Sequence, residues 1–316
     1  MNLKTTAAAA IALMAGVGAL AAPASAADEK FVLISHAPDS DSWWNTIKNA
    51  IAVASDEMKV TVDYRNPPTG DLADMARIVE QATAANPDGI IVTIADFDVL
   101  KGPIQAAVDQ GIPVITINSG TAEQSRELGA LLHVGQPEYD AGKGAGERAK
   151  AEGATSFLCV NHYITNPASV ERCQGFADGL GVELGSSMID SGIDPSEVQN
   201  KVAAYLSANP DTDAILTLGP NSAEPTIRAV KDAGLQPDDL VFGTFDLSAE
   251  IAAAIKDGTI DFAVDQQPFL QGYLPVVFLT NYARYGVIPA NDVNSGPGFI
   301  TAENIAQVEA LAGKYR

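Results

Sequence analysis

Runs rich in Val, Ile and Leu recur along the chain, and most are followed by a stretch whose apolar residues have helical spacing. Continuous rather than alternating apolar residues indicate strands that are covered on both faces. Such strands, alternating with helices, predict an α/β fold of parallel sheets flanked by helices. The runs lie at residues 30–36, 60–65, 89–95, 112–120, 130–135, 156–161, 186–190, 214–219, 241–246 and 261–266.

This number of strands predicts two doubly wound, Rossmann-like lobes rather than one open sheet. No low-complexity linker separates two halves, so we expect the lobes to be joined by short crossovers, near His133–Gln136 and near Gln266. We expect the lobes to have discontinuous sequences. They are residues 27–133 plus 267–297 for the amino-terminal lobe and residues 134–266 plus 298–316 for the carboxy-terminal lobe.

The amino terminus has a pattern of its own. One positive charge, Lys4, precedes an apolar run at 7–22, and the run is followed by Ala24-Ser25-Ala26, a pair of small residues around one intervening position. This arrangement is typical of a secretory signal peptide cleaved after Ala26. We therefore expect residues 1–26 to be a signal peptide and the mature chain to be exported.

Composition narrows the function. The 316 residues include 40 acidic and 19 basic side chains, for a net charge of −21. This acidity argues against nucleic acids and anionic membrane surfaces as partners, because both would repel the protein. The three histidines, His36, His133 and His162, show no paired ligand spacing, so we expect neither a metal site nor a cofactor.

Cys159 and Cys173 are the only cysteines. Export to an oxidising compartment allows a disulfide between them. Two buried free thiols are equally compatible with the sequence, because Cys159 lies in an apolar strand and Cys173 in the helix that follows.

Small polar residues follow most of the predicted strands. In open parallel sheets, ligands bind outside the carboxyl ends of the strands, so these side chains are candidates for one shared site. Helix capping also favours Ser, Asn and Asp and explains many of the same positions. The residues concerned are Ser35, Asn118, Ser119, Asn161, His162, Gly219, Pro220, Asn221, Asp246, Asp265 and Gln266.

The only two tryptophans, Trp43 and Trp44, are adjacent and follow the first strand. Ser42 is the expected N-cap of their helix, and neighbouring helical positions point about 100° apart. One ring is then free to face a cleft while the other packs against the sheet. An aromatic face attracts the C–H groups of a sugar ring, and Asp41 is placed to accept hydroxyl protons. Burial in the core is the alternative role for at least one ring.

Four segments, at 31–51, 89–120, 165–180 and 242–272, together resemble the periplasmic sugar-binding proteins of the ribose/galactose type. The resemblance extends over essentially the whole mature chain. It implies the type I periplasmic binding protein fold, with a multi-strand hinge and a periplasmic location. It also implies a small neutral sugar or sugar alcohol as ligand, an inner-membrane ABC permease as partner, no cofactor and no catalysis.

By the same resemblance, Trp43 and Trp44 stack on the sugar, and polar side chains from both lobes bind its hydroxyls. The chain departs from the ribose binders at Asn118-Ser119, where those proteins have Asp-Arg, at Gly219-Pro220-Asn221, where the family has Asn-Asp, and in a longer first loop. These departures argue against ribose. The expected polar contacts are Ser35, Asp41, Asn118, Asn166, Arg172, Asn221, Asp246 and Gln266.

Other functions fit less well. The same binding fold can report to a chemoreceptor or a sensor kinase instead of, or as well as, a permease. A carbohydrate-active enzyme would need a nucleophile and a base, and no G-x-S-x-G elbow is present. The glycine-rich GKGAGER at 142–148 lacks dinucleotide-binding spacing and is better explained by close helix packing. A repressor of the lactose type would carry a basic DNA-binding segment at the amino terminus, which this acidic chain lacks.

Overall fold

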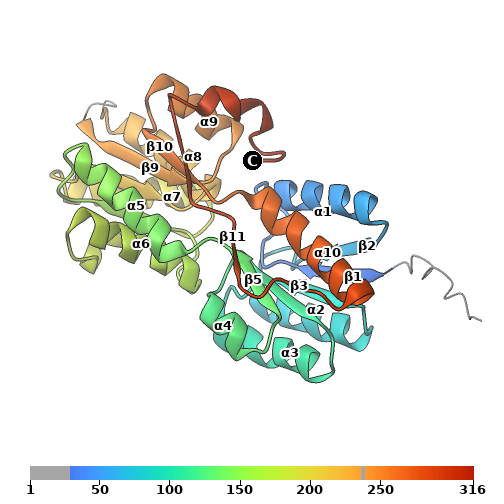
Figure 1. The fold of residues 1–316 in the computed structure, drawn as a ribbon. Coiled ribbons are helices and arrows are strands. Elements are labelled where there is room, and N and C mark those ends of the chain that lie inside the picture. Colours follow the sequence, from blue (N-terminus) through green and yellow to red (C-terminus); the bar gives the residue numbers. More distant parts are fainter. Residues whose placement is uncertain (1–28, 236–238) are drawn as a thin grey trace, which may run out of the picture.

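The computed structural model describes residues 29–235 and 239–316, so the predicted signal peptide lies outside the described residues. The chain forms two six-stranded sheets, each with helices on both faces (Figure 1). The first sheet is entirely parallel, with the order β11-β5-β4-β3-β1-β2. Its strands are β1 (Lys30–Ile34), β2 (Thr61–Arg65), β3 (Gly89–Val92), β4 (Val114–Ile117), β5 (Leu132–Gly135) and β11 (Val293–Asn294).

Residues of β1 alternate between two apolar clusters of the first lobe. Phe31 and Leu33 pack with residues of α1 (Trp44–Met58) and α10 (Pro268–Tyr285). Val32 and Ile34 pack with residues of α2 (Leu72–Ala84) and α3 (Phe97–Asp109). Burial on both faces accounts for the continuous apolar run in the sequence. The short helix α4 (Ala122–Glu127) follows β4.

The second sheet has the order β12-β10-β9-β8-β6-β7, and only its edge strand β12 is antiparallel to its neighbour. Its strands are β6 (Leu158–Asn161), β7 (Met188–Asp190), β8 (Ala214–Thr217), β9 (Val241–Phe245), β10 (Phe262–Asp265) and β12 (Gly298–Thr301). One apolar cluster involves α5 (Glu138–Ala151) and α6 (Pro167–Leu180). The other involves α7 (Pro195–Ala208), α8 (Pro220–Asp232) and α9 (Ala249–Asp257).

Helices α5 and α6 pack backbone to backbone through glycines. A Cβ atom on Gly142 would lie 2.2 Å from the carbonyl oxygen of Arg172, and one on Gly175 would lie 2.1 Å from that of Tyr139. Gly146 and Gly179 make equally close approaches. The glycine-rich GKGAGER segment is therefore explained by helix packing, as predicted, and this packing brings the first turn of α5 beside Arg172.

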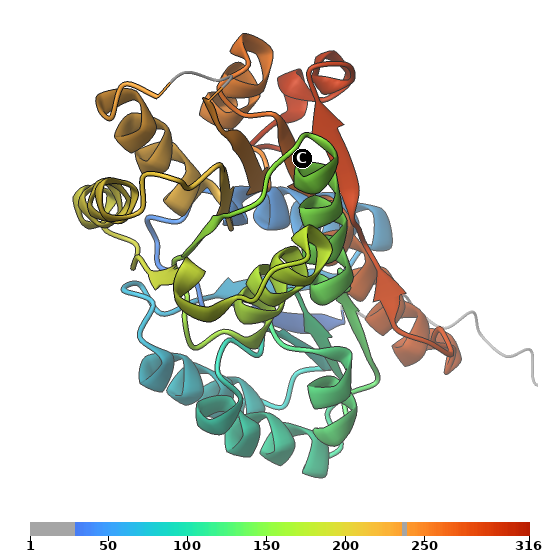
Figure 2. The same ribbon diagram turned by 90° about the vertical axis from the view of Figure 1, so that its left-hand side faces the viewer.

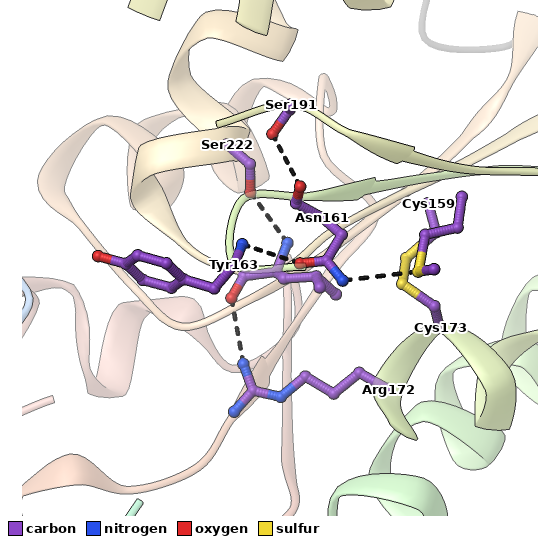
Figure 3. The surroundings of a disulfide bond; sticks show 9 residues. Cys159, Asn161, Tyr163, Arg172, Cys173, Ser191 and Ser222 are labelled. Atoms are coloured by element: carbon purple, nitrogen blue, oxygen red, sulfur yellow. Dashed lines mark hydrogen bonds between the residues drawn. A yellow bond between two sulfur atoms is a disulfide. The ribbon is translucent and has the colours of Figure 1, made fainter. Parts of the chain in front are cut away.

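The two cysteines form a disulfide. Cys159 in β6 and Cys173 in α6 are bonded, with their Cα atoms 5.8 Å apart, and both are fully buried. The bond fixes α6 to the sheet at the residue next to Arg172 (Figure 3). Of the two possibilities left open by the sequence, the structure contains the bridge.

The chain passes between the sheets three times: after β5, after β10, and between β11 and β12. Figure 2 follows the last crossing, in red, along one side of the molecule. The first crossing comes after Gly135, at the end of β5. The Asp292 carboxylate just before β11 accepts a hydrogen bond from the backbone N–H of His133, 159 residues earlier. We propose that the lobes divide at these crossings.

Within the described part of the chain, no helix combines the length and the apolar character needed to cross a membrane.

Candidate functional site

A polar and aromatic cavity of about 50 Å³ lies between the two lobes. Its walls come from the carboxyl ends of strands in both sheets and from the loops and first helical turns that follow them. The lining residues are His36, Asp41, Trp43, Trp44, Asn118, Ser119, His162, Tyr163, Asn166, Ala168, Ser169, Arg172, Leu218, Gly219, Pro220, Asn221, Asp246 and Gln266.

With one exception, every side chain expected to touch a ligand lines this cavity. The exception is Ser35, which is fully buried and shares a 2.7 Å hydrogen bond with the hydroxyl of Tyr64. The structure thus places Ser35 behind the cavity wall, where its hydroxyl supports β2. The position of Ser35 at the end of β1 does not reveal that its partner is Tyr64, because Tyr64 lies 29 residues away in the sequence.

Both tryptophans face the cavity, and both are largely buried, with 8% of Trp43 and 2% of Trp44 exposed. Their rings lie edge to face at 73°, with centroids 5.1 Å apart. The indole N–H of Trp43 has no hydrogen-bond partner among the described residues. The two rings therefore offer an apolar surface and an unused donor, which suits a ring-shaped ligand with hydroxyls at its edge.

The predicted cap of α1 is wrong. Ser42 makes no side-chain cap, and it is the carboxylate of Asp41 that accepts a hydrogen bond from the backbone N–H of Trp43, at 3.1 Å. Burial raises the pKa of Asp41 to about 6. Hydrogen bonding by Trp43 and Asn221 and the positive charge of Lys48 lower the pKa, but burial has the larger effect. Asn221 belongs to α8 of the other lobe, so Asp41 has neighbours on both sides of the cavity.

Arg172 is held rigidly in the second lobe. Its Nε and Nη2 donate to the two carboxylate oxygens of Glu138 at 2.6 and 2.8 Å, and its Nη1 donates to the carbonyl of Leu218 at 3.1 Å. The guanidinium also lies over the ring of Phe245, 4.4 Å from its centroid. Burial disfavours the charge, but Glu138 outweighs this and raises the pKa of Arg172.

Asp246 follows β9 in a left-handed conformation with φ of 65°, which few residues other than Gly, Asn and Asp adopt readily. Its two carboxylate oxygens accept from Nε2 of Gln266 at 2.8 and 2.9 Å. Burial raises the pKa of Asp246 to about 7, although Arg172, Gln266 and Trp43 act to lower it. The Trp43 indole is near enough for this effect but does not form a hydrogen bond of good geometry with the carboxylate.

Hydrogen bonds close the cleft around the cavity. Asn118 of the first lobe, also left-handed at φ of 57°, donates from Nδ2 to Oε1 of Gln266 at 3.1 Å. Nδ2 of Asn166, from the second lobe, donates to Oγ of Ser119 at 2.9 Å. Oδ1 of Asn166 also caps α6 through the N–H of Ala168. Asn166 therefore both caps a helix and lines the cavity, the two roles that the sequence suggested for polar residues after strands.

Nine lining residues were not among the predicted ligand contacts, and four of these have polar or aromatic side chains at strand ends: His36, Ser119, His162 and Tyr163. Each follows a strand directly or within two residues. The strand-end pattern named Ser119 and His162 as candidates for a shared site, but it did not name His36 or Tyr163. Burial lowers the pKa of His36 to about 4 and, with Arg172 and His36 nearby, that of His162 to about 3. Both rings are thus neutral, and the buried hydroxyl of Tyr163 has no hydrogen-bond partner in the part of the chain that the structure describes.

Across residues 29–235 and 239–316, no group of three or more His, Cys, Asp or Glu side chains is arranged to hold a metal ion.

Comparison with known proteins gives a consistent result. A family model described as "Periplasmic binding protein domain" matches residues 31–286. A solved carbohydrate transporter protein from Acidothermus cellulolyticus, in complex with myo-inositol, is 33% identical, with a TM-score of 0.84 over 91% of this chain and 100% of that chain.

Two curated sugar-binding proteins are more distant. The xylose/arabinose-binding protein XylF of Sulfolobus acidocaldarius is 26% identical over 78% of this chain, and the match spans 64% of that protein's length. The D-ribose/D-allose-binding protein of Pseudomonas aeruginosa is 28% identical over 62% of this chain and 63% of its own.

These matches agree with the two-lobed α/β architecture. The family consists of solute-binding proteins without catalytic activity, in agreement with the prediction that the protein is not an enzyme. The chain belongs to the periplasmic binding protein family, among the sugar-binding proteins of ABC transporters of the ribose, xylose and galactose type.

Proposed function

We propose that this protein is the solute-binding component of an ABC importer and binds a neutral monosaccharide or sugar alcohol between its lobes. The observation that carries the proposal is the cavity itself, in which two tryptophan rings face amide, carboxylate and guanidinium groups contributed by both lobes. Aromatic faces bind the apolar faces of a sugar ring, and the polar groups bind its hydroxyls.

The ligand would act by holding the lobes together. Trp43 and Trp44 belong to the first lobe, while Arg172 and Asp246 belong to the second. A ligand that contacts both sets binds the closed form better than the open form and shifts the population toward closure. We propose that the closed form is what an inner-membrane permease recognises, after export directed by residues 1–26.

The small cavity favours one ring-sized molecule. The complex of the A. cellulolyticus protein with myo-inositol makes a cyclic polyol a reasonable first ligand, and the departures at Asn118-Ser119 argue against ribose. We therefore propose myo-inositol, D-xylose, L-arabinose and D-galactose as the initial set.

Isothermal titration calorimetry of the purified mature chain against this set tests the proposal. We expect micromolar or tighter binding of at least one member with a stoichiometry of one. Mass spectrometry of small molecules released from the freshly purified, then denatured, protein extends the test to ligands outside the set. If no sugar or polyol binds and none is released, the proposed function is wrong.

A further inference from the structure

Among the described residues that line the cavity, Arg172 is the only arginine, and its charge is neutralised by Glu138 from outside the cavity. Both carboxylate oxygens of Glu138 pair with Arg172, and the two side chains are 2% and 8% exposed. Glu138 also accepts from Nε2 of Gln136 at 2.7 Å but does not line the cavity. Three of the five N–H donors of Arg172 are used in these bonds, so two remain for a ligand. The net charge of the Arg172–Glu138 ion pair is zero.

Two further carboxylates face the cavity without such a partner. Asp41 comes from the first lobe and Asp246 from the second, and they are 7% and 5% exposed. Their hydrogen-bond partners in the wall are an N–H of Trp43 and the amide of Gln266, which are neutral. The lining residues include no lysine, and both lining histidines are neutral.

The charged groups around the two carboxylates do not change this balance. Lys48 acts on Asp41 from an exposed position. Asp246 has Arg172 on one side and the buried Asp265 on another, and Asp265 is paired with Arg316. The cavity wall therefore carries an excess of negative charge when its carboxylates are ionised.

From this geometry we propose that the cleft selects polyols bearing a protonated amino group, such as amino sugars or aminocyclitols, over neutral polyols of the same shape. The inference rests on the proposed solute-binding function of this cleft, and it replaces the neutral ligand proposed above by a basic polyol of similar shape. An ammonium group would complete the charge balance and donate hydrogen bonds to Asp41 or Asp246. The neighbouring faces of Trp43, Trp44 and Tyr163 also attract a cation.

Burial has a supporting effect. Without a cation, it raises the pKa of Asp41 and of Asp246 to about 6 and 7, so near neutrality these groups retain part of their protons. A bound ammonium stabilises the ionised carboxylates, and its binding should release protons to the buffer.

The same excess of negative charge should weaken the binding of acidic sugars. A sugar carboxylate would meet Asp41 and Asp246 while the single cation of the wall is engaged by Glu138. Glu138 therefore acts as a specificity-determining residue through Arg172, although it does not reach the ligand.

Calorimetry of the intact mature protein at pH 7 and low salt tests the inference with two matched series. One compares myo-inositol with scyllo-inosamine, and the other compares D-glucose, D-glucosamine and D-glucuronate. In at least one series we expect the amine to bind tenfold or more tightly than the neutral compound. We expect the acid to bind at least tenfold more weakly than D-glucose. Repeating the amine titration in buffers of different ionisation enthalpy should reveal proton release.

Glu138→Gln keeps the shape of the side chain and leaves the charge of Arg172 uncompensated. We expect this variant to lose most of the advantage of the amine over the neutral parent. Glu171→Gln is the matched control, because it removes a half-buried negative charge near Glu138 that does not line the cavity, and it should leave the ratio unchanged.

Thermal melting shows whether each variant is folded, and the wild-type series decides the question if Glu138→Gln is not. If the neutral parent binds as tightly as the amine in both series, the inference is wrong while the proposed function stands. If none of the compounds in the two series or the earlier set binds, and no sugar or polyol is released from the purified protein, the proposed function itself fails.

Discussion

Asn166 and Ser119 join the two lobes directly across the cleft, through a 2.9 Å hydrogen bond between Nδ2 and Oγ. The same serine hydroxyl donates to Oδ1 of Asn118 at 3.0 Å. Both ends are buried, with 2% of Ser119 and 5% of Asn166 exposed. Because the bond joins the two lobes, opening the cleft would break it, so it should favour the closed form.

Ser119→Ala should therefore weaken ligand binding by about 1 kcal/mol, the usual net contribution of one hydrogen bond. Calorimetry measures the affinity, and small-angle X-ray scattering of the ligand-free protein should show a larger radius of gyration. Ser125→Ala is the control, because Ser125 is buried in the same lobe and accepts a hydrogen bond from Thr116 away from the cleft. Equal affinities for Ser119→Ala and the wild type would show that the bond contributes nothing to closure.

The tryptophans provide a spectroscopic test. The sequence contains only Trp43 and Trp44, and both line the cavity, so intrinsic fluorescence should change when ligand binds. Trp44→Ala or Trp43→Ala should weaken binding by about 1–3 kcal/mol if the ring packs on the ligand. Circular dichroism establishes that each variant is folded. Full affinity in both folded single variants would rule out stacking.

Asp246 should make the ligand-free protein less stable as pH rises. Its folded pKa of about 7 lies above its ordinary value of 3.8, so the stability it contributes is complete at low pH and is lost as pH rises through about 7. The melting temperature of Asp246→Asn minus that of the wild type should increase from pH 5 to pH 8. The buried histidines are shared by both proteins and cancel in this difference. A flat difference would mean that Asp246 is ionised throughout.

Gly142 should tolerate no side chain, because the added Cβ would lie 2.2 Å from the Arg172 carbonyl. Gly142→Ala should lower the free energy of unfolding by about 1–3 kcal/mol and weaken ligand binding by moving Arg172. Gly144→Ala is the matched change in the same helix, where the Cβ meets only the ring of Phe299 at 3.3 Å. Denaturant unfolding and calorimetry distinguish the two. If both variants behaved alike, close helix packing would not explain the glycine.

The disulfide should stabilise the fold without contributing to binding. It joins residues 14 apart, and a loop of about that size gives roughly 3 kcal/mol in the chain-entropy model. The double replacement Cys159→Ser and Cys173→Ser should lower the melting temperature and leave affinity nearly unchanged, since neither sulfur lines the cavity. Thiol titration of the denatured, unreduced wild type should find no free thiol; two thiols would contradict the bridge.

The sequence predicted the two sheets because burial on both faces leaves continuous apolar runs, as in β1 with Phe31 and Leu33 on one side and Val32 and Ile34 on the other. It predicted most of the cavity because parallel strands bring their carboxyl ends to one edge, so that residues as distant as Trp43 and Asp246 converge.

Other features depend on contacts that periodicity does not encode. Glu138 is identifiable as the partner of Arg172 only once the glycines of α5 and α6 are seen to bring the helices together. Ser35 faces Tyr64 because of the register of β1 and β2. Ser42 does not cap α1 because the helix begins later than expected, with Trp43 at its N-cap, and Asp41 accepts a hydrogen bond from the N–H of Trp43. Each of these three features depends on how segments pack in three dimensions or on the exact start of a helix, which the pattern of apolar and polar residues does not determine.

The bond between Asp292 and the backbone of His133, across 159 residues, has a consequence for the newly made chain. The first sheet gains its edge strand β11 only after the entire second sheet except β12 has been synthesised. Such distant pairing requires closure of a long loop and slows folding relative to local pairing. The first sheet is therefore completed only when nearly the whole chain has been made, which suits a chain that must be unfolded during the export proposed for residues 1–26.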